Sequence, residues 1–312
     1  MHSGDNSQPV AILMTLFDGA PHVEEQLESL HRQTYRNWTL HVSDDGSRDD
    51  GPDRVRAFAL RTGHEVRLYR GPGAGYASNF LSLLDAPDDR DGYAAFCDHD
   101  DIWLPDKLAR AVSALADHPS DRPALYGART WIWTPDTDAR RLSQPRPRPT
   151  GFRNALAQNY AGGNTMVFNR AAIDLARRAR DAAAGIVSHD WWLYQIVTGG
   201  GGTAIFDPEP ALLYRQHHRN QIGANDGARA GLARLRHVFA GRYANWNDAN
   251  LAALDGASNL LTEDSRKVLS HFAACRSRNP ARRLVALYRS GLYRQSLRGT
   301  LALWAAALFG KL

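Results

Sequence analysis

Short apolar runs alternate with longer amphipathic stretches along the N-terminal third of the chain. Each apolar run has the length of a strand and is followed by polar or glycine-containing residues, whereas the stretches between the runs have helical spacing. This alternation predicts repeated βα units and a largely parallel sheet. The expected strands are residues 10–17 (VAILMTLF), 39–43, 66–69 and 93–97, and the expected helices are 21–33, 48–61, 77–84 and 105–116.

The pattern changes after residue 117, where strands and helices no longer alternate regularly. We expect strands at 124–133, 162–168, 203–206 and 211–215, helices at 170–184 and near 190–197, and a proline-rich loop at 134–150. This mixed order predicts antiparallel strands added to the same sheet. From residue 228 the chain has the pattern of several helices, and its last apolar run, 300–310, is shorter than the roughly 20 residues that cross a bilayer.

Composition excludes disordered and fibrous classes, because 43% of the 312 residues are hydrophobic and 23% are charged. Cys97 and Cys275 are too few and too far apart for a disulfide scaffold or a zinc site, which indicates a reducing compartment. The polar start MHSGDNSQPV lacks the pattern of a signal peptide. We therefore expect a cytoplasmic protein.

Charge is unevenly divided along the chain. Residues 228–312 hold 14 Lys and Arg against 4 Asp and Glu, a net charge of +10, and the rest holds 24 against 29, a net charge of −5. An acidic body with a basic tail argues against a uniformly basic nucleic-acid binder. It favours a tail that contacts something anionic.

Two acidic clusters follow predicted strands: residues 44–47 (DDGS) and 98–101 (DHDD). Ligands of open parallel sheets bind at the carboxyl ends of the strands, where these clusters would lie. Clustered carboxylates repel one another unless a divalent cation neutralises them, and Mg²⁺ or Mn²⁺ bound by oxygen ligands is commonly shared with substrate phosphates. Each cluster alone could be a turn with a helix cap, but two at strand ends favour a site for a nucleotide diphosphate compound.

Five segments, taken in order, resemble a family 2 glycosyltransferase of the GT-A fold across roughly residues 9–225. They are VAILMTLFD (10–18), LHRQTYRNW (30–38), DDGS (44–47), FCDHDDIWLPDKL (96–108) and SHDWW (188–192). The resemblance implies an α/β fold with a Rossmann-like mixed sheet flanked by helices and a C-terminal helical extension. Together with YRQHHRNQIGA (214–224), the acidic segment most resembles bacterial rhamnosyltransferases that build surface polysaccharide.

The implied domain organisation has two parts. Residues 1–227 would form the GT-A catalytic domain, with a nucleotide-binding half at about 9–118 and an acceptor half at about 119–227. Residues 228–312 would form the basic helical region.

The resemblance also implies a site for the nucleotide sugar. Thr15 and Phe17 would contact base and ribose, Asp45 would accept a hydrogen bond from the pyrimidine, and Arg70 would reach the base or a phosphate. Relatives often carry Tyr-Asn or Tyr-Glu where this chain has Phe17-Asp18, so their phenol contact is absent here. The implied set is Thr15, Phe17, Asp18, Asp45, Arg70, Asn79, Asp98, His99, Gly163 and Asn164.

The segment from Asp98 to Asp100 matches the D-x-D element of the family. In that element Asp100 would bind Mg²⁺ or Mn²⁺ and Asp98 would face ribose or sugar, whereas Asp101 could equally cap the next helix. His217 lies where some relatives place a further metal or phosphate contact, and a surface histidine is the alternative.

Asp190 matches the catalytic base of the family. An inverting transfer is a direct displacement, so one carboxylate must take the proton of the acceptor hydroxyl. The alternative role for Asp190 is an N-cap of an apolar helix. Gly163 and Asn164 resemble a turn beneath the donor sugar, although a bulge would also need glycine. Trp131, Trp133 and Tyr160 could stack on sugars or belong to the core.

The C-terminal arginines are followed by an apolar run, as in helices that lie in a membrane interface. The alternative is a helical subdomain that packs on the catalytic domain or forms a dimer seam. The residues concerned are Arg282, Arg283, Arg289, Arg294 and Arg298, then Leu301, Leu303, Trp304, Leu308 and Phe309.

The resemblance therefore predicts an inverting, metal-dependent glycosyltransferase at the inner face of the bacterial membrane. It would move L-rhamnose from dTDP-L-rhamnose to a polyprenyl-diphosphate-linked or other glycan, with no nucleic-acid partner. A UDP-hexose donor and an inactive glycan-binding or scaffold protein are the alternatives. A nucleotidyltransferase is disfavoured, because TLFDGAPH (15–22) is not a Gly-rich basic phosphate loop.

Overall fold

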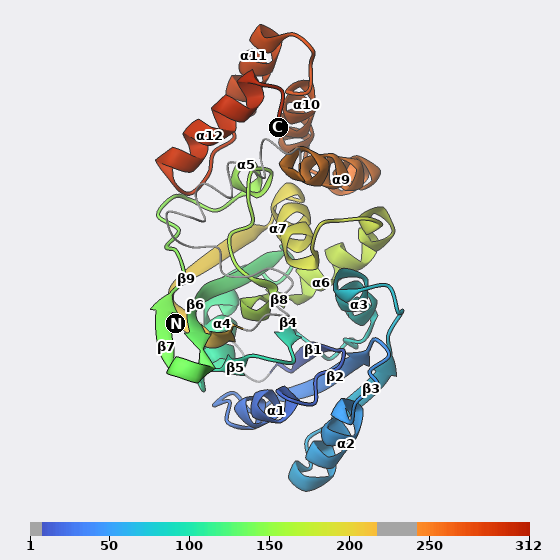
Figure 1. Cartoon of the computed structure of the whole chain (residues 1–312). Helices are drawn as coiled ribbons and strands as arrows, with labels where there is room; N and C mark the ends of the chain where they lie inside the picture. The colour runs from blue at the N-terminus through green and yellow to red at the C-terminus, as the bar shows by residue number, and fades with distance from the viewer. Residues whose placement is uncertain (1–7, 217–241) are drawn as a thin grey trace.

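A computed structural model describes residues 8–216 and 242–312 and contains one mixed sheet of nine strands flanked by helices (Figure 1). The strand order is β3-β2-β1-β4-β8-β6-β9-β5, and β7 pairs with β6 outside this path. The strands are β1 (Val10–Leu16), β2 (Trp38–Asp44), β3 (Val66–Arg70), β4 (Tyr93–Asp98), β5 (Ile102–Trp103), β6 (Ala124–Thr134), β7 (Ala139–Leu142), β8 (Val167–Asn169) and β9 (Thr203–Arg215).

The first four strands confirm the predicted parallel sheet. β1 pairs in parallel with β2 and β4, and β2 pairs in parallel with β3. All seven residues of β1 are buried, as expected for a strand covered by helices on both faces. The helices of this half are α1 (Val23–His31), α2 (Gly51–Thr62), α3 (Tyr76–Ser82) and α4 (Lys107–Ala116).

The second half adds antiparallel strands, as predicted. β8 runs antiparallel to β4 and β6, β9 runs parallel to β6, and β5 pairs antiparallel with β9. The helices here are α5 (Phe152–Ala155), α6 (Arg170–Arg178) and α7 (His189–Gly199).

Three predictions about this half are wrong. The strand expected at 162–168 begins only at Val167 as β8, because residues 163–165 form a short 3-10 helix. The strands expected at 203–206 and 211–215 form the single strand β9, in which register shifts against β6 accommodate Pro208 and Pro210. Proline removes a ladder hydrogen bond and is tolerated in strands at such irregularities. The loop expected at 134–150 contains β7, because a turn with Asp138 in the left-handed region folds the chain back onto β6.

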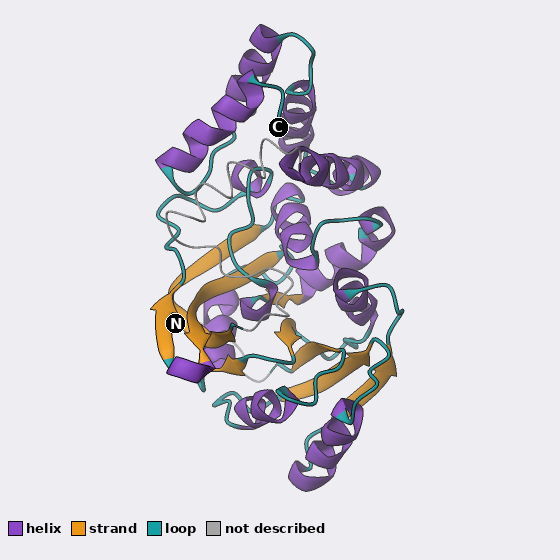
Figure 2. Cartoon of the chain, in the orientation of Figure 1, coloured by secondary structure: helices purple, strands orange, loops and turns teal. Residues whose placement is uncertain are grey.

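Alternate residues of β1 belong to different hydrophobic cores, one on each face of the sheet. Ile12 and Met14 pack in the core covered by α1, α2 and α4, whereas Ala11 and Leu13 pack in the core that includes residues of α3, α6 and α7. Figure 2 shows the strands between these helical layers. The carboxyl ends of the strands lie between the two cores.

The C-terminal helices extend the second of these cores. They are α9 (Arg242–Gly256), α10 (Glu263–Ala274), α11 (Pro280–Ser290) and α12 (Leu297–Leu308). Leu254, Phe272 and Leu287 pack in the core that also contains Trp192 and Ile196 of α7. The buried amide of Asn154 donates to the carbonyl of Tyr293 at 3.1 Å. The domain boundary predicted between 227 and 228 lies outside the described residues.

No helix in the described ranges combines the length and the apolar character needed to cross a membrane.

Candidate active site

The ends of β1, β2 and β4 bring the two acidic clusters to one edge of the sheet. Thr15 of β1 pairs with Ser43 of β2 and with Asp98 of β4. The DDGS and DHDD segments therefore leave the sheet on either side of the end of β1. Both clusters therefore follow the ends of strands, β2 and β4, which flank β1.

Asp18 joins the turn after β1 to the turn after β2. Its N–H donates to Ser47 Oγ at 3.0 Å, and the N–H of Arg48 donates to Asp18 Oδ1 at 2.8 Å. Asp18 has a left-handed backbone with φ of 46°. Beside it, the ring of Phe17 is 55% exposed and open to stacking.

Asp45 and Asn79 both lie next to Gly71. The carboxylate of Asp45 accepts hydrogen bonds from the N–H groups of Gly73 at 2.6 Å and Gly75 at 3.2 Å. The amide nitrogen of Asn79 donates to the Ser43 carbonyl at 3.1 Å, and its buried Oδ1 has no partner. A Cβ added to Gly71 would lie 2.7 Å from Asp45 Oδ1 and 2.9 Å from Asn79 Oδ1, so only glycine fits between these groups.

Two other residues predicted to contact the donor, Arg70 and His99, lie at or directly after the ends of strands β3 and β4. Arg70 is exposed at the end of the edge strand β3. His99 contacts the end of β1, where its Nδ1 lies 3.2 Å from the Thr15 carbonyl. A Cβ on Gly19 would lie 2.6 Å from His99 Cδ2, so the imidazole also packs on the turn after β1.

Asp98, Asp100 and Asp190 form one electrostatic group. Desolvation, followed by the charges of Asp100 and Asp190, raises the pKa of Asp98 to about 8. A raised pKa in a carboxylic acid means that nearby negative charge and burial oppose its ionisation. The predicted metal ligand and the predicted base are therefore close enough to affect the same side chain.

Asp101 does not cap the following helix. Asp101 is fully buried. Its carboxylate accepts hydrogen bonds from the side-chain amide of Asn164 at 2.5 Å and from the N–H of Arg215 at 3.2 Å. The alternative of a cap is wrong because β5 intervenes, and α4 begins only after Asp106. Asn164 is thus held at the acidic segment, close to where the resemblance places the donor sugar.

Arg215 is a residue of this site that the sequence analysis missed. Its Nε donates to the Asp100 carbonyl at 2.8 Å, and its guanidinium forms an ion pair with Glu25 of α1. The same group lies 4.6 Å from the ring centroid of Trp133. The one signal in the sequence for Arg215 is that a basic residue ends an apolar strand. This strand lies far along the chain from the acidic segment.

Asp190 lies in the first turn of α7, and both of its carboxylate oxygens are held by backbone N–H groups. Oδ2 accepts from Gly163 at 3.1 Å and Oδ1 accepts from Trp191 at 2.7 Å. Ser188, not Asp190, is the N-cap residue of α7. These two hydrogen bonds fix the orientation of the carboxylate at the start of α7.

His189 fills the space beneath Gly163. Its ring stacks on Phe80 at a centroid distance of 3.8 Å and meets Phe96 edge-on at 4.8 Å. Both ring nitrogens are buried without a partner, and burial lowers the pKa of the imidazole to about 4. A neutral ring therefore supports the turn that binds Asp190. Gly163 begins a short 3-10 helix (η3, Gly163–Thr165), which is a turn rather than a strand bulge.

Tyr76 of α3 links the nucleotide half to the segment before α7. Its hydroxyl donates to the Val187 carbonyl at 3.1 Å. Burial, followed by the charges of Asp190 and Asp98, raises the pKa of this phenol to about 12. No pattern in the sequence singles out Tyr76.

The predicted sugar-stacking aromatics fall into two classes. Tyr160 is fully buried and belongs to the core, whereas Trp131 and Trp133 on β6 are half-buried. Only the two tryptophans are accessible enough to meet a sugar.

Within residues 8–216 and 242–312, no three or more His, Cys, Asp or Glu side chains are grouped so that they could hold a metal ion. Mg²⁺ is usually held by one or two carboxylates together with the phosphate oxygens of a substrate. The predicted ligand Asp100 could supply one such carboxylate, and a bound diphosphate could supply the phosphate oxygens. His217, the further predicted ligand, lies outside the described residues.

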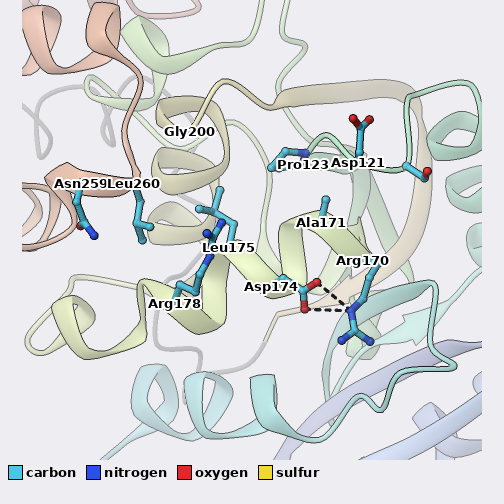
Figure 3. Close-up of a pocket in the computed structure, with 11 residues that line it drawn as sticks. Asp121, Pro123, Arg170, Ala171, Asp174, Leu175, Arg178, Gly200, Asn259 and Leu260 are labelled. Atoms are coloured by element: carbon cyan, nitrogen blue, oxygen red, sulfur yellow. Dashed lines mark hydrogen bonds and ion pairs between the residues drawn. The ribbon is translucent and has the colours of Figure 1, made fainter.

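One hollow in the described part of the chain lies away from these carboxylates. It has a volume of about 710 Å³ and lies between α6, the loop before β6 and the segment at Asn259 and Leu260 (Figure 3). Arg170 pairs with Asp174 in its wall. No predicted site residue lines this hollow.

Comparisons with known proteins identify the family of this chain. The sequence profile described as Glycosyl transferase family 2 matches residues 11–175. The dTDP-rhamnosyl transferase RfbG of Shigella flexneri is 27% identical over 228 residues, which cover 71% of this chain and 78% of that protein.

Two solved structures share the fold. The mannosyltransferase PcManGT from Pyrobaculum calidifontis, in complex with GDP-Man and Mn²⁺, matches with a TM-score of 0.52 at 20% identity, over 97% of this chain and 85% of that chain. TarS 1-349 of S. aureus, in complex with UDP-GlcNAc, matches with a TM-score of 0.52 at 13% identity, over 91% and 93% of the two chains. The mixed sheet and the carboxylates at the strand ends are consistent with the family match. The chain therefore belongs to glycosyl transferase family 2 and is a glycosyltransferase of the GT-A fold.

Proposed function

We propose that this enzyme transfers L-rhamnose, with inversion, from dTDP-L-rhamnose to a lipid-linked or other glycan of a bacterial surface polysaccharide. The observation that carries the proposal is the carboxylate of Asp190, which two backbone N–H groups hold beside the acidic D-x-D segment. The similarity to a dTDP-rhamnosyl transferase over 71% of the chain supports the choice of donor.

Asp190 acts as the general base of this reaction. It accepts the proton of the acceptor hydroxyl, whose oxygen forms the new bond to the anomeric carbon as the bond from that carbon to the diphosphate oxygen breaks. Asp100 would hold a Mg²⁺ or Mn²⁺ ion, which would neutralise charge on the departing diphosphate.

The base pocket recognises a pyrimidine. The carboxylate of Asp45 accepts hydrogen bonds, so it suits a ring N–H such as that shared by thymine and uracil. Phe17 offers an exposed ring for stacking. Because Asp45 does not distinguish the two bases, a UDP-hexose remains the alternative donor.

If the acceptor is lipid-linked, the enzyme acts at the inner face of the membrane, because such a glycan is anchored in the bilayer. The other candidate is a glycan-binding protein without turnover. Asp100 and Asp190 are both present, and this favours the enzyme.

Thermal unfolding with a panel of ligands tests the donor. The ligands are dTDP, UDP, GDP, dTDP-L-rhamnose and UDP-glucose, each with and without Mg²⁺ or Mn²⁺. A ligand at about 100 times its Kd adds about 2.7 kcal/mol to the free energy of unfolding. We expect metal-dependent stabilisation by the dTDP compounds, its loss in Asp100→Ala and its retention in Asp117→Ala, which removes an exposed carboxylate after α4.

Each alternative has a distinct result. Stabilisation by UDP compounds alone would refute rhamnose and keep the reaction type. Stabilisation by none of the ligands would favour the glycan-binding protein. If dTDP compounds stabilise, transfer of rhamnose to a lipid-linked glycan extract, detected by mass spectrometry, tests the acceptor.

A further inference from the structure

Exposed large hydrophobic side chains gather at the C-terminal end of the molecule. In the part of the chain that the structure describes there are nine such residues, of which six lie on α11, on α12 or directly after α12. The other three belong to the nucleotide half and include Phe17 of the donor pocket. The six are Val285, Tyr288, Leu297, Leu301, Leu308 and Phe309.

Helix α12 is apolar on both its inner and its outer face. Leu303, Ala306 and Ala307 are buried in the core. The opposite face exposes Leu297 by 73% and Phe309 by 61%, with Leu301 and Leu308 between them. A helix that is apolar all round is normally covered all round, so the outer face indicates a missing partner.

The structure corrects which C-terminal residues are available to a partner. Arg283 is buried and its guanidinium donates to the Ala307 carbonyl at 2.6 Å and the Leu308 carbonyl at 2.5 Å, where it closes the end of α12. Leu303 also faces inward. These two residues, expected from the sequence at a membrane interface, instead join α11 to α12.

Helix α11 adds a basic rim to the apolar face. Arg282, Val285 and Arg289 are spaced three and four residues apart, Tyr288 follows Val285 by three residues, and all four are exposed. Two apolar side chains therefore lie between two arginines along one stripe. In Figure 1, α11 and α12 form one end of the molecule, remote from α2.

The charge of this region identifies the kind of partner. Residues 265–312 contain ten Lys and Arg and no Asp or Glu. A symmetric contact with a second copy would place this basic surface against itself, and like charges repel. An anionic bilayer offers both an apolar interior for the leucines and phenylalanine and a negative surface for the arginines.

We propose that the exposed faces of α11 and α12 form a docking surface for an anionic membrane, called here the α11–α12 face and comprising Arg282, Val285, Tyr288, Arg289, Leu297, Arg298, Leu301, Leu308 and Phe309. The helices lie on the bilayer with their exposed apolar side chains inserted at the headgroup boundary. This docking surface goes beyond the transfer reaction, because it does not depend on which sugar is moved.

Vesicle co-sedimentation of the full chain tests the proposal. The probes are phosphatidylcholine vesicles with and without phosphatidylglycerol, at low and high salt. We expect binding to the anionic vesicles, weaker binding at high salt, and little binding to phosphatidylcholine alone. Leu301→Ser/Phe309→Ser and Arg282→Gln/Arg289→Gln should each weaken the vesicle affinity by about tenfold or more.

Matched controls separate this surface from general effects. Leu60→Ser removes a side chain that is 89% exposed on α2, and Arg32→Gln/Arg56→Gln removes two exposed arginines of the nucleotide half. Both should bind vesicles like the wild type. Thermal unfolding of every variant checks that the fold is retained.

Two results would overturn the proposal. One is vesicle binding that is absent in the wild type or unchanged in the Leu301 and Arg282 variants. The other is a concentration-dependent dimer in sedimentation velocity that Leu301→Ser/Phe309→Ser converts to a monomer, which would assign the face to a second copy. Ligand-induced stabilisation by nucleotides should be unchanged in these variants, so failure here is distinguishable from failure of the donor assignment.

Discussion

Replacing Gly163 with alanine tests how the candidate base is aimed. An added Cβ would overlap Nε2 of His189 and lie 3.1 Å from its Cε1 and 3.2 Å from Asp190 Cβ. His189 has little freedom to yield, because its ring stacks on Phe80 at 3.8 Å and meets Phe96 at 4.8 Å. The new methyl group must therefore displace either the turn or Asp190.

The expected effect on turnover is much larger than that on nucleotide binding. Overpacking a buried site costs about 1–3 kcal/mol of stability. Shifting a reacting group by about 1 Å can reduce the rate about 100-fold. We therefore expect kcat for sugar transfer to fall about 100-fold, whereas nucleotide-induced thermal stabilisation persists because Asp45 and Asn79 are untouched.

A double variant supplies the control. His189→Ala removes the ring that the new methyl group meets, so Gly163→Ala/His189→Ala should be more active than Gly163→Ala alone. Such a non-additive result measures the coupling between the two positions. If Gly163→Ala retains kcat within about twofold of the wild type, the turn does not aim Asp190 and the reasoning fails.

Three further predictions concern the base, the acidic segment and pH. Asp190→Asn should reduce kcat by about 100-fold to 10,000-fold with the donor KM nearly unchanged, since the amide cannot accept the proton; steady-state kinetics would contradict this if KM alone rose. Arg215→Ala should lower the free energy of unfolding by about 1–3 kcal/mol and weaken metal-dependent nucleotide binding, because it removes the bond to the Asp100 carbonyl; unchanged binding in calorimetry would argue against its positioning role. Burial lowers the pKa of His41 from 6.5 to about 4 in the folded protein. As the pH falls from 6.5 towards 4, His41 is protonated in the unfolded chain but stays neutral in the folded protein, so the free energy of unfolding decreases. Between pH 6.5 and 5 the wild type should lose on the order of 2 kcal/mol relative to His41→Phe in urea unfolding, and parallel pH curves would disprove this.

The parts of the fold that could be predicted are those with unambiguous burial. β1 is buried at every position, and its continuous apolar run predicted a buried strand. β9 was divided in two, because Pro208 and Pro210 normally break strands, and only the register shifts against β6 accommodate them. Sequence patterns do not reveal such irregularities, since they depend on the neighbouring strand.

The candidate site shows the same limit. Asp44, Asp45 and the DHDD segment could be assigned to the ends of strands by counting residues. Separating Asp100 from Asp101 required β5, which turns Asp101 inward to Asn164. Arg215 lies 115 residues from Asp100, and His189 acts through its shape rather than its charge. Neither role leaves a local pattern in the sequence.

The hydrogen bond from Asn154 to Tyr293 has a consequence for the order in which the chain folds during synthesis. These partners are 139 residues apart, and Gln295 bonds to the same buried Asn154 side chain. Contacts between such distant segments form late, because a long loop must close first. The ribosome therefore releases β1–β4 with their helices long before the residues that satisfy Asn154 emerge. We expect the acceptor half of the nascent chain to remain partly exposed until α11 and α12 are synthesised. Chaperones would bind the chain during this interval.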